Sequence, residues 1–275
     1  MEGRRRAATR RVGRAGALSR AARAPRPRGR RRAGGVPPAR SRGAGGGSRG
    51  GRIRRARRRR RAHVSRWGRT HLTPDLLEFI RTWLPAPPAS VIEVGCGDGR
   101  LTAHLRERGH RVIGIDPEAP EGAPFIATTL ERFRTDDPFD AAVAIRSLHH
   151  VGDLPAAIDS LHAALRPRGR LVMLEFAVEN VDDAARRWQA EVGLPETRTA
   201  NMHDVIALTE VRGALGRRFR ELAFEPGPYL AREAEREDLL GRELAAIEAG
   251  ELRPVGARLA FDAIEPDEQG ARSAR

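Results

Sequence analysis

Three glycines at alternate positions, preceded by a carboxylate, form the segment of this sequence best suited to bind a ligand. Gly95, Gly97 and Gly99 follow residues 91–94, which have the length and apolar composition of a buried strand. Glycine permits positive φ and has no Cβ, so a ligand can approach the backbone closely. Glu93 stands two residues before the first glycine. The pattern predicts that the Glu93 carboxylate points into the crevice above the glycine loop, where the ligand would bind.

A second carboxylate, Asp116, ends a strand predicted over residues 111–115. The dinucleotide fingerprint G-x-G-x-x-G would require a glycine where this sequence has Arg100. Acids at Glu93 and Asp98 also disfavour a pyrophosphate at the start of the following helix. An acidic glycine loop instead suits a ligand that is cationic and carries hydroxyl groups.

Polar residues also follow a strand predicted to end at Ile145. Arg146 and Ser147 come next, and His149 and His150 stand slightly later, towards the next helix. Ligands of open α/β sheets bind beyond the carboxyl ends of the strands, so Ile145 and the residues after it should line the crevice. Either histidine is a candidate general base, because imidazole accepts protons near neutral pH. The alternative is that one ring packs on the next helix and the other is solvated.

Taken together, these motifs resemble the Rossmann-like (class I) S-adenosylmethionine (SAM)-dependent methyltransferases, of the type 11/12 kind. The resemblance covers residues 90–176 and includes E-x-G-x-G-x-G at 93–99, the acid at 116, F-D at 139–140 and L-R-P-R-G at 165–169. In that family the glycine loop lies against the methionine part of SAM, and the acid after the second strand binds the ribose. Where the family has an acid or amide for adenine, this sequence has threonines at 128 and 129, so backbone groups near Leu130 are the alternative contact. The cofactor-binding residues implied are Glu93, Gly95, Gly97, Gly99, Asp116, Thr129, Leu130 and Ile145.

The resemblance implies an α/β fold, namely a doubly wound, mostly parallel, seven-stranded Rossmann-like sheet with helices on both faces and an antiparallel last strand. Periodicity predicts helices over residues 74–84, 153–165, 182–192, 202–219 and 230–249. Strands six and seven are predicted over 220–225 and 257–263, and 165–170 is read as a turn. Three residues in the less specific part beyond residue 176 are candidate acceptor contacts, although each also fits an ordinary packing or surface role: Glu191, His203 and Tyr229.

Charge divides the chain into two parts. Residues 1–66 contain 25 arginines and one acid, whereas the remaining 209 residues contain 26 arginines and 35 acids, a net charge of −9. The first part is poor in large apolar residues, so we expect a disordered Arg/Gly/Ala-rich tail. Three interpretations of the tail stay open: a contact for nucleic acid, a transit-like peptide, and upstream sequence read through from a misassigned start. The methyltransferase domain is predicted over 67–265, followed by a frayed end at 266–275.

The sequence therefore predicts a SAM-dependent enzyme that methylates a small-molecule acceptor. The alternatives are a nucleic-acid-binding or RNA-modifying methyltransferase that uses the tail, a non-catalytic SAM-binding protein and, more weakly, an NAD-dependent oxidoreductase. Nucleic acid is expected to bind through the tail only, because the body is acidic. We expect no metal and no membrane span. We also expect a cytoplasmic location, because the single cysteine fits a reducing compartment. The sequence leaves the acceptor and the oligomeric state open.

Overall fold

The computed structural model describes residues 72–194 and 205–265. The predicted tail, the predicted frayed end and His203 lie outside these residues. Within them, seven strands form one sheet in the order β3-β2-β1-β4-β5-β7-β6. The strands are β1 Ser90–Val94, β2 Arg111–Asp116, β3 Phe125–Ala127, β4 Phe139–Ile145, β5 Leu165–Phe176, β6 Phe219–Gly227 and β7 Gly256–Ala263.

The first five strands are parallel, and β7 is antiparallel to both of its neighbours, β5 and β6. The strand order reverses between β1 and β4, which brings the glycine loop after β1 beside the segment after β4. Such a reversal opens a crevice above the carboxyl ends of the strands, where ligands bind. The predicted doubly wound sheet with an antiparallel last strand is confirmed.

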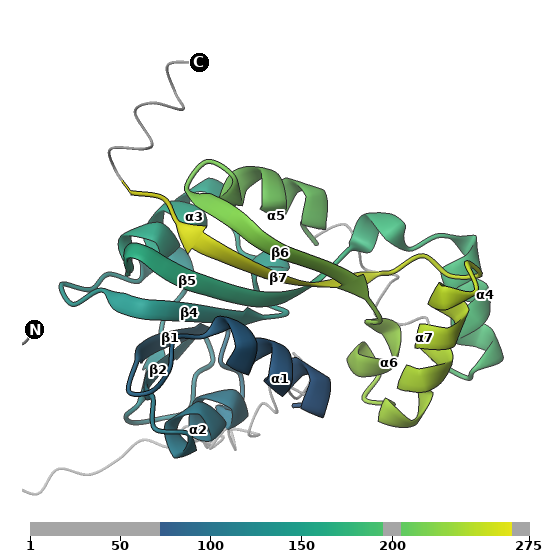
Figure 1. Ribbon diagram of the computed structural model, residues 1–275, viewed down its shortest axis with the longest axis horizontal. Helices are drawn as coiled ribbons and strands as arrows, with labels where there is room; N and C mark the ends of the chain where they lie inside the picture. The colour runs from purple at the N-terminus through teal and green to yellow at the C-terminus, as the bar shows by residue number, and fades with distance from the viewer. Residues whose placement is uncertain (1–71, 195–204, 266–275) are drawn as a thin grey trace, which may run out of the picture. The chain divides into compact units, whose positions relative to one another are not determined.

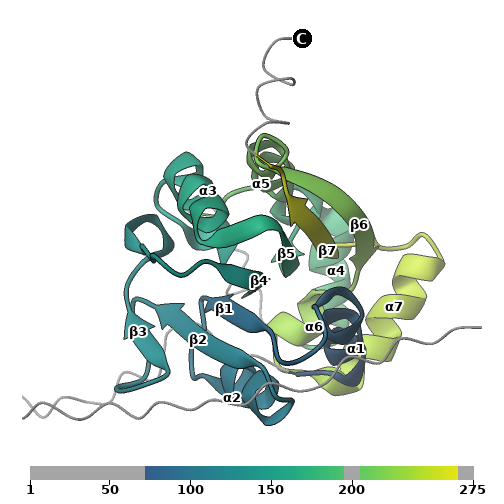
Figure 2. The same cartoon turned by 60° about the vertical axis from the view of Figure 1, so that its left-hand side comes forward.

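Helices cover both faces of the sheet (Figures 1 and 2). Helices α1 and α2 lie on one face, and α3 and α5 lie on the other, while α4, α6 and α7 gather at one end of the sheet. The α-helices are α1 Pro74–Trp83, α2 Arg100–Glu107, α3 Leu154–Ala163, α4 Asp183–Glu191, α5 Leu208–Leu215, α6 Leu230–Glu233 and α7 Leu240–Glu248. None of the helices in the described residues is both long and apolar enough to cross a membrane.

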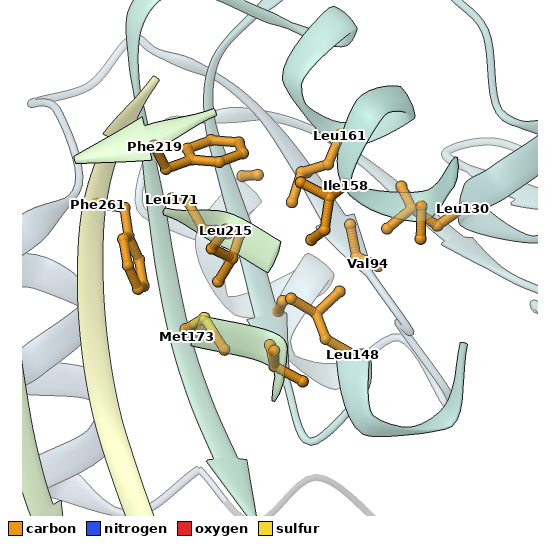
Figure 3. Close-up of a cluster of buried hydrophobic side chains, with 14 of the residues drawn as sticks. Val94, Leu130, Leu148, Ile158, Leu161, Leu171, Met173, Leu215, Phe219 and Phe261 are labelled. Atoms are coloured by element: carbon orange, nitrogen blue, oxygen red, sulfur yellow. The ribbon is translucent and has the colours of Figure 1, made fainter. Parts of the chain in front are cut away.

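Three buried clusters follow from this layering. The largest joins the sheet to α3 and α5, and its centre is drawn in Figure 3. The second joins the opposite face of the sheet to α1 and α2. The third lies outside both layers, where α4, α6 and α7 pack on Phe176 at the end of β5. The third cluster therefore places helices beside the carboxyl edge of the sheet, where a ligand would enter.

Three local predictions were wrong. The helix predicted over 230–249 is broken into α6 and α7, with a left-handed residue at Glu235 (φ 57°) and a short 3₁₀ turn, Glu237–Leu239, between them. The break lets the buried carboxylate of Glu243 turn back and accept hydrogen bonds from three backbone N–H groups at the start of α6. The predicted turn at 165–170 belongs to β5, which is irregular there, and the described part of the 202–219 helix is confined to α5.

Candidate functional site

The glycine loop is closely packed at its first glycine and open at its second. Gly95 has φ 71°, and a Cβ placed on it would lie 2.5 Å from the Cβ of Ser147. Gly97 has φ 50°, yet among residues 72–194 and 205–265 no heavy atom beyond its own residue and its two chain neighbours lies within 4 Å of the place that a Cβ would take. The first glycine is thus required by the approach of the segment after β4. The second leaves the backbone bare towards open space, as a ligand cradle requires.

Asp116 ties the end of β2 to this loop. One carboxylate oxygen accepts a hydrogen bond from the Gly97 N–H (3.1 Å), and the other accepts from the Glu118 N–H (2.8 Å). The side chain is partly exposed, so it remains accessible at the edge of the sheet. The structure therefore brings together the predicted glycine loop and the predicted second acid.

Glu93 does not point into the crevice as the sequence suggested. Its side chain is only 1% exposed and accepts a hydrogen bond from the Thr102 hydroxyl of α2. Burial raises the pKa of Glu93 to about 8, and the nearby carboxylates Asp98 and Asp116 add to the rise. Below that pH the carboxyl group is neutral. Glu93 therefore acts as a buried hydrogen-bonding residue that links the end of β1 to α2.

The remaining predicted cofactor residues occupy three different environments. Thr129 is partly exposed directly before the short 3₁₀ turn Leu130–Arg132. The side chain of Leu130 is buried in the main core, so only its backbone could face a ligand. The side chain of Ile145 is buried in the cluster under α1 and α2. The contribution of Ile145 to a crevice is therefore also limited to its backbone.

Ser147 supplies an unused polar atom beside the loop. Its Oγ is buried and has no hydrogen-bond partner in the described structure. It lies 3.3 Å from the position of a Cβ on Gly95. Buried hydroxyls are ordinarily hydrogen-bonded, so an orphan at this place marks a contact that a ligand can complete.

His149 and Glu175 form a buried pair at the next strand end. The Nδ1 of His149 is hydrogen-bonded to one oxygen of Glu175, and the other oxygen accepts from the backbone N–H groups of Ser147 (3.0 Å) and Leu148 (2.7 Å). Burial by itself would raise the pKa of Glu175, but the charge of His149 and these hydrogen bonds outweigh it and hold the pKa below its usual value. The pair thus fixes the chain between Ser147 and His149.

His150 is exposed, and its ring centroid lies 4.0 Å from that of His149. Partial desolvation, followed by the charge of His149, lowers the pKa of His150 to about 4. The ring is therefore neutral near pH 7, and its conjugate acid is a strong one. A base of this strength removes protons poorly from alcohols or ammonium groups.

An ion pair that the sequence did not reveal lies beside the histidines. Arg146, in a left-handed conformation (φ 55°), places Nη1 2.7 Å from an Oε of Glu233 on α6. Tyr229, directly before α6, is buried and stacks on Phe176 with ring centroids 4.7 Å apart. Burial and the charge of Glu233 raise the pKa of the Tyr229 phenol well above its ordinary value. Of the candidate acceptor contacts named from the sequence, Tyr229 lies in this group.

The sequence signals that could have revealed Glu175, Glu233 and Glu243 differ in strength. Glu175 directly follows the apolar run 171–174, which comes shortly after the L-R-P-R-G motif, so its place near the end of a buried strand can be read from the sequence. Glu233 and Glu243 stand in a charged helical segment with no distinguishing neighbours. Only the folding of α6 against the sheet brings Glu233 to Arg146, 87 residues away in the chain.

Comparison with known proteins agrees with this geometry. The sequence profile of the methyltransferase domain family matches residues 57–221, more than half of the chain. The chain therefore belongs to this methyltransferase family, and the resemblance to class I SAM-dependent methyltransferases drawn from the glycine loop is confirmed.

Two curated relatives illustrate how far the similarity extends. An uncharacterized methyltransferase of Mycobacterium bovis is 31% identical over 136 residues, which is 46% of this chain and 53% of the relative. A malonyl-[acyl-carrier protein] O-methyltransferase of Pseudescherichia vulneris is 28% identical over 113 residues, 38% of this chain and 45% of the relative. The chain thus spans about half the length of the curated relatives it matches.

Solved structures of similar fold include a SAM-dependent methyltransferase from Mesorhizobium loti, with a TM-score of 0.46 and 19% identity over 66% of this chain and 95% of that one. The N-methyltransferase NodS from Bradyrhizobium japonicum, solved with S-adenosyl-L-homocysteine (SAH), has a TM-score of 0.44 and 19% identity over 70% of this chain and 86% of that one.

Proposed function

We propose that this protein transfers the methyl group of SAM to a small-molecule acceptor bound beyond the carboxyl ends of β1 and β4. The observation that supports this most strongly is the open position at Gly97, beside the carboxylate of Asp116. A bare, acidic loop fits a ligand with a cationic end and hydroxyl groups. When bound, SAM would supply a methyl group that its sulfonium already activates.

The chain's own residues hold and orient the two partners. Asp116 would bind the ribose hydroxyls, and the bare backbone at Gly97, with the orphan hydroxyl of Ser147, would face the methionine part. Thr129 and the backbone of Leu130 are the proposed adenine contacts. Orientation alone can lower the barrier of such a displacement by roughly 7–11 kcal/mol. The protein therefore needs to supply alignment and exclusion of water more than acid–base chemistry.

The acceptor is proposed to enter between the end of β4 and α6, where Arg146, His150 and Glu233 lie. The relatives do not identify it, because their names include the methyltransferase acting on malonyl-[acyl-carrier protein] and a ubiquinone biosynthesis O-methyltransferase from Xylella fastidiosa. A nucleic-acid acceptor is less favoured, because the part of the chain after residue 66 has a net charge of −9 and would repel a polyanion.

The proposal is tested by incubating the full chain with methyl-labelled SAM and a library of metabolites, followed by mass spectrometry. We expect label in at least one small product and formation of SAH. Label in added RNA alone would support the nucleic-acid alternative. SAM binding without turnover on either set would support a non-catalytic SAM-binding protein.

A further inference from the structure

The arginine at the end of β4 is held in a conformation that suits recognition of an anion. Arg146 has φ 55°, a left-handed value that is unfavourable for a residue with a side chain and that tends to persist at ligand sites. Its side chain is 11% exposed and faces Glu233, whose side chain is 28% exposed, from the last residue of α6. The pair is thus partly shielded from water but still reachable. A guanidinium in such a place binds a carboxylate strongly.

The titratable side chains around Arg146 are poorly suited to remove a proton. His149 is buried and hydrogen-bonded to Glu175. His150 is a weak base, because its pKa is lowered to about 4. Tyr229 is buried and keeps its proton, and Glu233 is paired with Arg146. An alcohol or an ammonium acceptor must lose a proton to be methylated, whereas a carboxylate is already deprotonated at neutral pH.

We propose that the methyl acceptor is a small carboxylic acid, whose carboxylate replaces Glu233 as the partner of Arg146 and receives the methyl group on one oxygen. This inference rests on the SAM-dependent function proposed above. One carboxylate oxygen forms a bond to the methyl carbon as the carbon–sulfur bond breaks, and the electron pair of that bond remains on sulfur. The products are a methyl ester and a neutral thioether, and no proton moves.

The charges of the crevice agree with this reaction. On the glycine-loop side Asp116 accepts from the loop and Asp98 is paired with Arg100, whereas on the β4 side Glu233 balances the charge of Arg146 until a ligand carboxylate takes its place. A carboxylate and a sulfonium neutralise each other as they react, so charge decreases towards the transition state. A site shielded from water favours such a step, because water stabilises the two separate ions more than it stabilises the transition state, in which their charges are partly neutralised.

The experiment uses the full chain with methyl-deuterated SAM and a panel of carboxylic acids, each matched with its primary amide and its alcohol. Mild alkali releases the label as methanol from methyl esters but not from ethers or N-methyl groups. We expect alkali-labile label in products of the acids only. Arg146→Met should raise the KM for the acid about tenfold to a hundredfold, since it removes a charged hydrogen-bond donor. Glu233→Gln should lower that KM, because it weakens the competing partner.

Arg220→Met is the matched control, because Arg220 lies on β6 and pairs with Asp262. We expect it to leave the KM unchanged. SAM affinity, measured by calorimetry on each variant, separates the two proposals. If SAM does not bind the unmodified chain, the proposed function fails. If SAM binds but label appears only in alkali-stable products or in no acid of the panel, the carboxylic-acid inference alone is overturned. Should Arg146→Met fail to fold, the direction of the KM change in Glu233→Gln decides, and an unchanged KM overturns the inference.

Discussion

Two buried glutamates at neighbouring strand ends have pKa values shifted in opposite directions. Glu93, on β1, is 1% exposed, has a hydroxyl as its hydrogen-bond donor and lies near other carboxylates, and its pKa is raised to about 8. Glu175, on β5, is 0% exposed but accepts hydrogen bonds from three backbone N–H groups and faces His149, and its pKa is lowered. Burial is nearly equal, so the difference comes from the partners.

The contrast agrees with the proposal that one crevice binds two ligands of opposite charge. The β1 side is built from carboxylates and bare backbone, and it suits the cationic ligand. The β4–β5 side is organised by His149 and Arg146, which hold the carboxylates of Glu175 and Glu233. The contacts on the β1 side join residues close in the chain, such as Gly97 and Asp116, whereas the ion pair on the β4–β5 side joins residues 87 apart. Substitutions on each side should therefore have different signatures.

The largest effect is expected from Gly95→Ala. The new Cβ would collide with Ser147 and would stand at φ 71°, so we expect a loss of about 3–5 kcal/mol in the free energy of unfolding, together with loss of SAM binding. Gly97→Ala is the matched variant, since its Cβ enters open space. It should cost only about 1 kcal/mol of stability and still abolish SAM binding. Urea unfolding and calorimetry on both variants check this, and equal stability losses would contradict the packing difference.

Glu93→Gln should change the pH dependence of stability. Between pH 4.5 and about 8 the carboxyl group is ionised in the unfolded chain and protonated in the folded one. The folded state then binds more protons, so stability falls as pH rises through this window. We expect the variant to lack this decline and to exceed the unmodified protein by on the order of 3 kcal/mol at pH 8. Urea unfolding from pH 5 to 8 measures it, and parallel curves for the two proteins would refute the assignment.

Glu175→Gln should act at the opposite end of the pH scale. The folded-state pKa lies below the ordinary value of 4.5, so its stabilisation is present above pH 4.5 and is lost as pH falls towards the folded-state pKa. The variant should be less stable than the unmodified protein by about 2 kcal/mol near pH 7, with a smaller difference in acid. Thermal or urea unfolding at pH 3.5 and pH 7 checks this, and a difference that grows in acid would show that the sign is wrong.

The smallest effect is expected from His150→Gln. Because the ring of His150 is already neutral near pH 7 and weakly basic, we expect kcat to change by less than about threefold. Between pH 6 and 9, kcat of the variant should depend on pH in the same way as kcat of the unmodified enzyme. A hundredfold loss, with a profile that changes shape, would instead establish the general base that the sequence suggested.

How much the sequence revealed depends on whether the partners of a residue were close in the chain. The strand that the sequence predicts to end at Ile145 does end there in the structure, because an apolar run followed by polar residues can be recognised without distant information. Asp116 was placed correctly at the end of β2 for the same reason. The direction of the Glu93 side chain was predicted wrongly, because its hydrogen bond with Thr102 forms only when α2 packs on the sheet. The pairing of Arg146 with Glu233 was missed because it requires the break after α6.

The central claim is that the acidic glycine loop and Asp116 together bind SAM, and calorimetry with SAM and SAH tests it most directly. We predict that both ligands bind the full chain and that Asp116→Ala weakens SAM binding by about tenfold or more, since it removes a carboxylate proposed to hold two hydroxyls. A melting temperature close to that of the unmodified protein would show that the variant is folded. If neither ligand binds, or if a folded Asp116→Ala variant binds SAM as tightly as the unmodified protein, the crevice described here is not the SAM site.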